Sequence, residues 1–190
     1  MRLAGAYIGP SINSINRQNQ NMKKTVLRYG LLASVTVVGL FVFGFTVLRK
    51  MGYESQEVYG YTSMVLALLF VFFGIRHYRD KVNNGVLSFG KGMKVGTLIV
   101  LIPALAFGIF DVLYVLVFNP EFFDQYMEHQ LKSMKETMSA AEFEVAAKQL
   151  AVQQEMFSNP LITFTVMFLT VFMIGIIVTV ISSLILRRAR

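Results

Sequence analysis

The sequence predicts an all-α integral membrane protein: a four-helix bundle with an extracytoplasmic amphipathic helical hairpin between the third and fourth spans. Three observations predict this fold class. Hydrophobic residues make up 55% of the chain, which is too apolar for a soluble domain of 190 residues. Charged residues are only 15% of the total and fall in clusters between long uncharged runs. Each run is close to or above the roughly 20 residues that a helix needs to cross the roughly 30 Å hydrocarbon layer of a bilayer.

The first 22 residues are polar and carry too little apolar surface to offset the entropy of ordering a chain. We therefore expect residues 1–22 to form a disordered tail ahead of a single four-span domain, 23–190. Met22 precedes two lysines and an apolar run, which is typical of a natural start site. Residues 1–21 are then expected to be an upstream addition to the native protein.

Four runs that contain almost no charge are the predicted spans. The first is longer than the apolar region of a signal peptide, usually about 7 to 15 residues, so we expect an uncleaved anchor. Tyrosines near both ends of the second suit the membrane interface. The fourth is longer than the hydrocarbon layer requires, so we expect it to tilt or protrude. The spans cover about 29–48, 58–75, 95–118 and 161–186.

The distribution of lysine and arginine predicts the orientation. Five precede the first span, five lie between the second and third, and three follow the fourth, against two and three in the other two connections. By the positive-inside rule both termini are cytoplasmic. Basic residues beside apolar helices usually contact anionic lipid headgroups, so the net charge of +7 indicates lipid contact and not nucleic-acid binding. The residues expected to contact headgroups are Arg76, Arg79, Lys81, Lys91, Lys94, Arg187 and Arg188.

The connection 119–159 holds seven of the eleven acids of the chain. Asn119–Pro120 and Asn159–Pro160 are helix-start signals, and Ser139 with Glu142 forms a capping-box pattern. We expect two amphipathic helices outside the membrane, as a hairpin or as extensions of the spans. Their apolar stripes would be Phe123, Met127, Leu131, Met134 and Met138, followed by Phe143, Ala146, Leu150 and Phe157.

Asp111 is the strongest candidate for a functional residue because the predicted spans contain no other charge. An ionisable group within a span costs at least about 2.5 to 3.5 kcal/mol, so it should face the bundle interior. It shares a helix face with Ala104 and Gly108. Two interpretations stay open: a group that binds a proton or cation, and an acid that only packs and hydrogen-bonds. At its depth, the expected partners are Arg49, Ser63 and Thr165.

Other chemistry has weaker support in the sequence. The segment 85–92 nearly matches a phosphate-binding loop, but Gly92 stands where serine or threonine should bind magnesium, and no strand precedes it. Gly92 and Gly96 form a pair that permits close helix approach. The chain has no cysteine and only two histidines, and we expect no catalytic constellation, no cofactor and no metal site.

From about Met22 to Arg190 the chain resembles a bacterial four-span membrane family, the domain of unknown function four-one-nine-nine. The stretches that carry the resemblance are MKKTVLRYGLL, YGYTSMVLALLFVFFGIRHYRDK, SFGKGMKVGTLI, NPEFFDQY, FSNPL and GIIVTVISSLILRR. Their order along the chain matches as well. The resemblance implies a multi-pass protein of the bacterial inner membrane, and it implies no activity.

Two functions from different classes are therefore open. The first is a non-enzymatic interaction or structural module whose extracytoplasmic hairpin binds a membrane or periplasmic protein or a second copy of the chain. The second is a component of a small transporter or channel that uses Asp111. Four spans are few for a transport path, so this second function would require oligomerisation. An enzyme acting on lipid or nucleotide ranks third, because no group of residues supports it.

Overall fold

The computed structural model describes residues 12–47 and 52–188, and every regular element in that part of the chain is helical. The elements are α1 (Ile12–Val47), α2 (Tyr53–His77), the π-helical turn η1 (Tyr78–Val82), α3 (Phe89–Leu113), the π-helical turn η2 (Tyr114–Phe118), α4 (Phe122–Thr137), α5 (Ala140–Phe157) and α6 (Pro160–Leu186). Helices α1, α2, α3 and α6 are each long and apolar enough to cross a membrane. The predicted all-α fold with four spans is confirmed.

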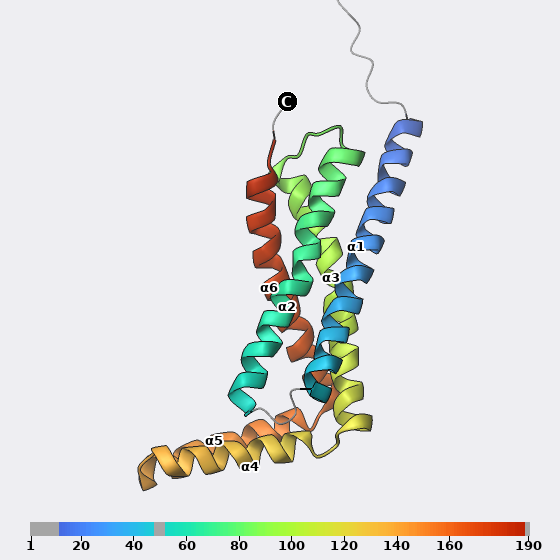
Figure 1. The fold of residues 1–190 in the computed structure, drawn as a ribbon. Coiled ribbons are helices and arrows are strands. Elements are labelled where there is room, and N and C mark those ends of the chain that lie inside the picture. Colours follow the sequence, from blue (N-terminus) through green and yellow to red (C-terminus); the bar gives the residue numbers. More distant parts are fainter. Residues whose placement is uncertain (1–11, 48–51, 189–190) are drawn as a thin grey trace, which may run out of the picture.

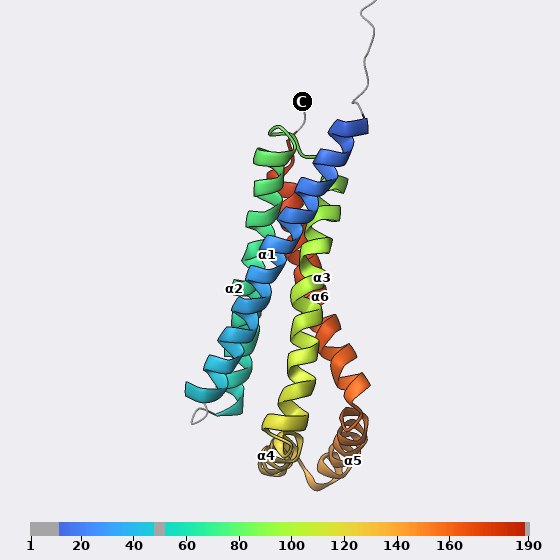
Figure 2. The same ribbon diagram turned by 90° about the vertical axis from the view of Figure 1, so that its right-hand side faces the viewer.

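The four long helices run alongside one another, and α4 and α5 lie across one end of this bundle as an antiparallel pair (Figures 1 and 2). We call α4 and α5 together the arm, and the end of the bundle that carries them the arm end. The start of α1, the α2–α3 loop and the end of α6 gather at the opposite end (Figure 1). We call it the basic end, because most lysines and arginines of the described residues lie there.

The surface of the bundle is apolar, as a lipid-facing surface must be. In the most apolar stretch of each span, only 17% to 39% of the residues are buried inside the protein. The remaining apolar side chains face outward, where a bilayer and not water is the compatible solvent. The chain is therefore a multi-pass membrane protein. The interior between the helices is filled by Val37, Leu68, Val71, Ile75, Ile99, Val100, Phe107 and Val171.

Small residues allow α3 and α6 to form the most extensive helix pair of the bundle. A Cβ atom added at Gly92 would stand 2.7 Å from the Oγ of Ser183, and one added at Gly96 would collide with Thr179. Gly175 of α6 meets Val100 of α3 in the same way. The predicted close approach at the glycine pair is confirmed, because no larger side chain would fit there.

The start of α1 corrects the predicted disordered tail. Helix α1 begins at Ile12, so residues 12–22 are helical, while residues 1–11 lie outside the described part of the chain. A helix that already exists extends without a new nucleation cost, which lets polar residues join it. The extension also has tertiary partners: Gln18 donates a hydrogen bond of 2.6 Å to Oδ1 of Asn83, and Met22 packs against the core.

The predicted helix starts around the arm are confirmed with one difference. At the start of α5, Ser139 accepts a hydrogen bond from the amide of Glu142, and the Glu142 carboxylate accepts one from the amide of Ser139. At the start of α6, the side chain of Asn159 accepts from the amide of Leu161 at 3.0 Å. Helix α4 differs, because it begins at Phe122, two residues after Pro120, where the sequence predicted the first helical position.

Candidate functional site

The two helices of the arm pack on each other through the apolar stripes predicted from the sequence. The rings of Phe123 and Phe157 stack with their centroids 5.5 Å apart. Met127 of α4 and Leu150 of α5 are buried between the helices. The side chain of Gln154 adds a hydrogen bond across the pair, to Asp124 of α4. Most of these stripes are therefore covered within the chain, whereas Met138 at the tip of the arm is 41% exposed.

A cluster of aromatic rings joins the arm to the bundle. The rings of Phe45 in α1 and Tyr114 in η2 stack at 4.2 Å, and Phe122 of α4 meets Tyr114 at 5.9 Å and Phe45 at 6.4 Å. Tyr126, one turn further along α4, stacks on Phe122. The side of α4 that carries Phe122 and Tyr126 therefore faces the bundle.

A cavity of about 330 Å³ lies where α3 and α6 meet the root of the arm. Its walls are mostly apolar, and Asp124, Gln154, Ser158 and Thr163 supply the polar groups. The Asp124 carboxylate and the Gln154 amide bond to each other at 2.8 Å. The apolar wall consists of Val112, Val115, Leu116, Pro120, Phe123, Phe157 and Pro160.

Asp111 lies in the half of α3 nearest the arm, in an aromatic environment. Phe107, one turn earlier, contacts Phe41 of α1 at 4.5 Å, and Gly108 lies against Phe164 of α6. The Oδ2 atom of Asp111 is buried and has no hydrogen-bond partner in the described part of the chain. A buried polar atom without a partner carries a cost of about 1 to 3 kcal/mol, more if it is charged.

Neither described member of the predicted partner set bonds to Asp111. Thr165 is exposed on α6, and its hydroxyl donates to the carbonyl of Leu161 in the same helix at 2.7 Å. Ser63 is buried on α2 and makes no hydrogen bond to the aspartate. Arg49 lies outside the described residues. Depth alone suggested these partners, but the rotation of each helix decides which side chains meet.

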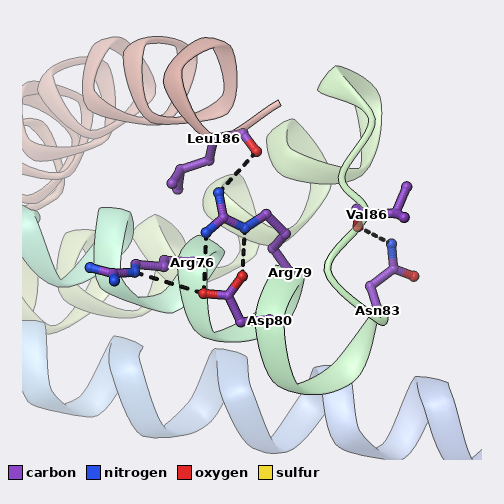
Figure 3. A network of polar contacts seen from close by, with 6 residues as sticks. All are labelled: Arg76, Arg79, Asp80, Asn83, Val86 and Leu186. Atoms are coloured by element: carbon purple, nitrogen blue, oxygen red, sulfur yellow. Dashed lines mark hydrogen bonds and ion pairs between the residues drawn. The ribbon is translucent and has the colours of Figure 1, made fainter. Parts of the chain in front are cut away.

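At the basic end, polar contacts connect α2, η1 and the end of α6 (Figure 3). Arg79 binds Asp80 through two hydrogen bonds, of 2.6 Å and 3.2 Å, and Arg76 approaches the same carboxylate at 3.7 Å. A third nitrogen of Arg79 donates to the carbonyl of Leu186 at 3.4 Å. That carbonyl belongs to the last turn of α6, where a cation also interacts favourably with the helix dipole.

The α2–α3 loop adds further contacts at the basic end. The side chain of Asn83 accepts hydrogen bonds from Gln18 of α1 and from Lys91 of α3. It also donates one to the carbonyl of Val86 in its own loop (Figure 3). The backbone of Leu87 exchanges two hydrogen bonds of 3.0 Å with that of Arg188. We call this set of contacts, from Gln18 to Arg188, the clamp. It connects all four spans at one end.

The sequence matches a family model over residues 28–188. This range covers the four predicted spans and the arm. The description of that family is "Protein of unknown function (DUF4199)". The chain belongs to the DUF4199 family. No curated protein and no solved structure matches it. The match includes most of the clamp, while the polar first turns of α1, with Gln18, lie outside it.

The structure of this DUF4199 protein separates the seven basic residues predicted to contact headgroups into two groups. Arg79 and Lys91 donate hydrogen bonds inside the clamp, so their side chains have intramolecular partners. Arg76 pairs with Asp80 yet keeps 58% of its side chain exposed. The remaining four are exposed at the basic end, and their contact with lipid stays a prediction. They are Lys81, Lys94, Arg187 and Arg188.

Several residues of the clamp, including Asn83 and Leu87, were missed by reasoning from the sequence. Leu87 lies in the segment 85–92 that nearly matches a phosphate-binding loop, and Asn83 lies two residues before that segment. The structure shows a tight turn between them, with positive φ angles at Asn84 and Gly85. An Asn-Gly pair is a known turn signal that could have indicated this geometry. Among the described residues, no three histidine, aspartate or glutamate side chains are placed to hold a metal ion.

Proposed function

We propose that this DUF4199 protein is a non-enzymatic structural or interaction module of the bacterial inner membrane. In this proposal both termini are cytoplasmic, and the arm lies on the outer face. Exposed cations at the basic end support the orientation, because lysine and arginine are enriched in cytoplasmic connections. Anionic headgroups of the cytoplasmic leaflet are then the expected partners of Lys81, Lys94, Arg187 and Arg188.

The observation that carries the proposed interaction role is that the two helices of the arm pack on each other. Its apolar stripes are closed by Met127, Leu150 and the stacked rings of Phe123 and Phe157. A preformed surface loses little conformational entropy on binding, which favours recognition. The surface left for a partner is the charged side of the arm. The partner would be another membrane protein or a second copy of the chain. The charged residues on this side of the arm include Glu128, Lys132, Lys135, Glu136, Glu144, Lys148 and Glu155.

The orientation is tested with single cysteines, since the native chain has none. Lys148→Cys in the arm should react with a membrane-impermeant maleimide in intact cells whose outer membrane has been made permeable to the reagent. Lys94→Cys at the basic end should react only after the inner membrane is permeabilised. The opposite pattern would place the termini outside and end this part of the proposal.

The interaction role is tested by photo-crosslinking in intact membranes. A photoreactive residue at Glu128 or Glu136 should give one discrete adduct, and that adduct should be lost when the neighbouring arm charges are reversed. The matched control is the same photoreactive residue at Leu169, which faces outward from α6. Adducts at Leu169 but none at either arm position would contradict the role of the arm. An adduct with the mass of two chains would identify a second copy as the partner.

A second function, a component of a small transporter or channel, is favoured by one observation. The buried Oδ2 atom of Asp111 has no hydrogen-bond partner in the described part of the chain. Intramembrane acids with this character often bind protons or cations. The test is ion flux into liposomes that contain the protein, compared with Asp111→Asn. Flux that is lost in the variant would support this function, and no flux with the native chain would exclude it.

A further inference from the structure

The position of the arm relative to the spans is the first step of a further inference. Helix α3 with η2 covers Phe89–Phe118, which at about 1.5 Å per residue is roughly 45 Å long and exceeds the hydrocarbon layer. Its arm end therefore reaches the headgroup region. The arm begins directly there, at Phe122, and runs across the direction of the spans (Figures 1 and 2). The arm thus lies along the plane of the membrane surface.

The second step is the distribution of charge around α4. Phe122 and Tyr126 face the bundle, and the amide of Gln130 donates to the Tyr126 hydroxyl at 2.9 Å on the same side. At 3.6 residues per turn this line continues through Ser133 and Thr137, and it contains no charged residue. The charged residues of this region all fall on the other sides of the helix: Glu121, Asp124, Glu128, Lys132, Lys135 and Glu136.

Helix α5 repeats this separation. With Leu150 facing α4, the ion pair of Glu144 and Lys148, 2.8 Å long, lies toward one flank together with Glu155. Val145 and Met156 lie toward the other flank. Because the helices are antiparallel, this apolar flank and the Phe122 line of α4 are on the same side of the arm. Glu142 is the exception, and its carboxylate is bound at the start of its own helix.

The third step is that this apolar flank of α5 is exposed. Val145 and Met156 are 60% and 50% exposed. Leu161, at the start of α6, is also exposed, and Ser158 and Asn159 separate it from Met156. We call the side of the arm that contains Phe122, Tyr126, Val145 and Met156 the uncharged flank.

We propose that the uncharged flank of the arm rests on the leaflet of the membrane that the bundle itself spans, at the depth of the lipid headgroups. Its aromatic and uncharged polar side chains suit that layer, where amphipathic helices bury one face. The charged side then points to water. The occupant of this flank is lipid, and the inference goes beyond the proposed function because it holds whichever protein binds the charged side.

The test places spin labels on single cysteines in the full-length protein, reconstituted in phosphatidylethanolamine and phosphatidylglycerol liposomes. Labels at Val145 and Met156 should collide more with oxygen, which concentrates in lipid, than with a water-soluble nickel chelate. Labels at Glu144 and Glu155, the matched controls on the same helix, should show the reverse. Equal access of the nickel chelate to both pairs would mean an arm in water. Protection of Val145 and Met156 from both reagents would mean a protein contact. Either result overturns the proposal.

Fluorescence gives a second and independent measurement, because the native chain contains no tryptophan. In Val145→Trp, lipids brominated near the headgroup should quench the emission strongly. In Glu144→Trp, soluble iodide should quench it instead. Equal quenching of both variants by iodide would contradict the membrane-resting arm even if the spin-label variants were poorly folded.

Discussion

The two ends of the bundle are built differently. At the basic end, contacts join residues far apart in the chain: Gln18 with Asn83, Arg79 with Leu186, and Leu87 with Arg188. At the arm end, the arm is attached through aromatic rings and short connections beside a cavity. Lipid supplies little hydrophobic driving force between helices, so small-residue packing and polar contacts hold the bundle. The clamp therefore fixes one end, and the other end is free to carry a projecting surface.

The largest expected effect comes from truncating a leucine in the clamp. Leu87 is completely buried, so Leu87→Ala should lower the free energy of unfolding by about 2 to 5 kcal/mol. Leu161→Ala is the matched change at the arm end, where the leucine is 71% exposed, and it should be close to neutral. Denaturant unfolding in detergent micelles measures both. Equal losses would remove the distinction between a fixed end and a free one.

The next effect tests the contact between α3 and α6. Gly96→Leu should destabilise the protein by about 1 to 3 kcal/mol, because the added side chain would collide with Thr179. Gly39→Leu is the control, since a Cβ at Gly39 meets nothing within 4 Å. Thermal unfolding of the two variants measures the difference. If Gly39→Leu were as damaging as Gly96→Leu, close packing between α3 and α6 would not explain the loss, because replacing glycine by leucine raises helix propensity at both positions.

The smallest effect concerns the tip of the arm. Hydrogen bonds from Ser139, first from its side chain and then from its backbone, hold the pKa of the Glu142 carboxyl below its ordinary value. The folded arm therefore binds fewer protons there than the unfolded chain does. This contribution to stability is fully present above the ordinary pKa of glutamate and is lost as the pH falls through the lowered pKa.

Hydrogen exchange of the first amides of α5 measures that effect. Protection should decrease a few-fold on acidification, beyond the intrinsic pH dependence of exchange, and Ser139→Ala should remove this decrease along with the cap. The amides of α3 provide the internal control, since the bundle should not respond. A decrease that persisted in Ser139→Ala would assign it to another group.

The spans and the arm could be predicted because their causes are local in the sequence. A bilayer requires about 20 apolar residues in a row, and a capping box such as Ser139 with Glu142 is contained within four residues. The helical start of α1 was not predicted. Its composition is polar, and part of its support comes from a partner 65 residues away, Asn83.

The candidate site was only partly predictable for the same physical reason. The sequence identified Asp111 as the acid within a span, since that follows from counting charges. It could not identify the neighbours of that acid, because a helix of known depth still has an unknown rotation. Thr165 therefore faces outward from α6. The clamp was missed for a similar reason, since Arg79 and Leu186 are 107 residues apart.

The short connections between the arm and helices α3 and α6 give the arm mechanical leverage. Its root is attached to the two helices that pack most extensively, and α4 is 16 residues long, about 24 Å. A change of roughly 10° at the root would therefore move the tip by about 4 Å. A small tilt between α3 and α6 would therefore move the tip of the arm by more than it moves the helices themselves.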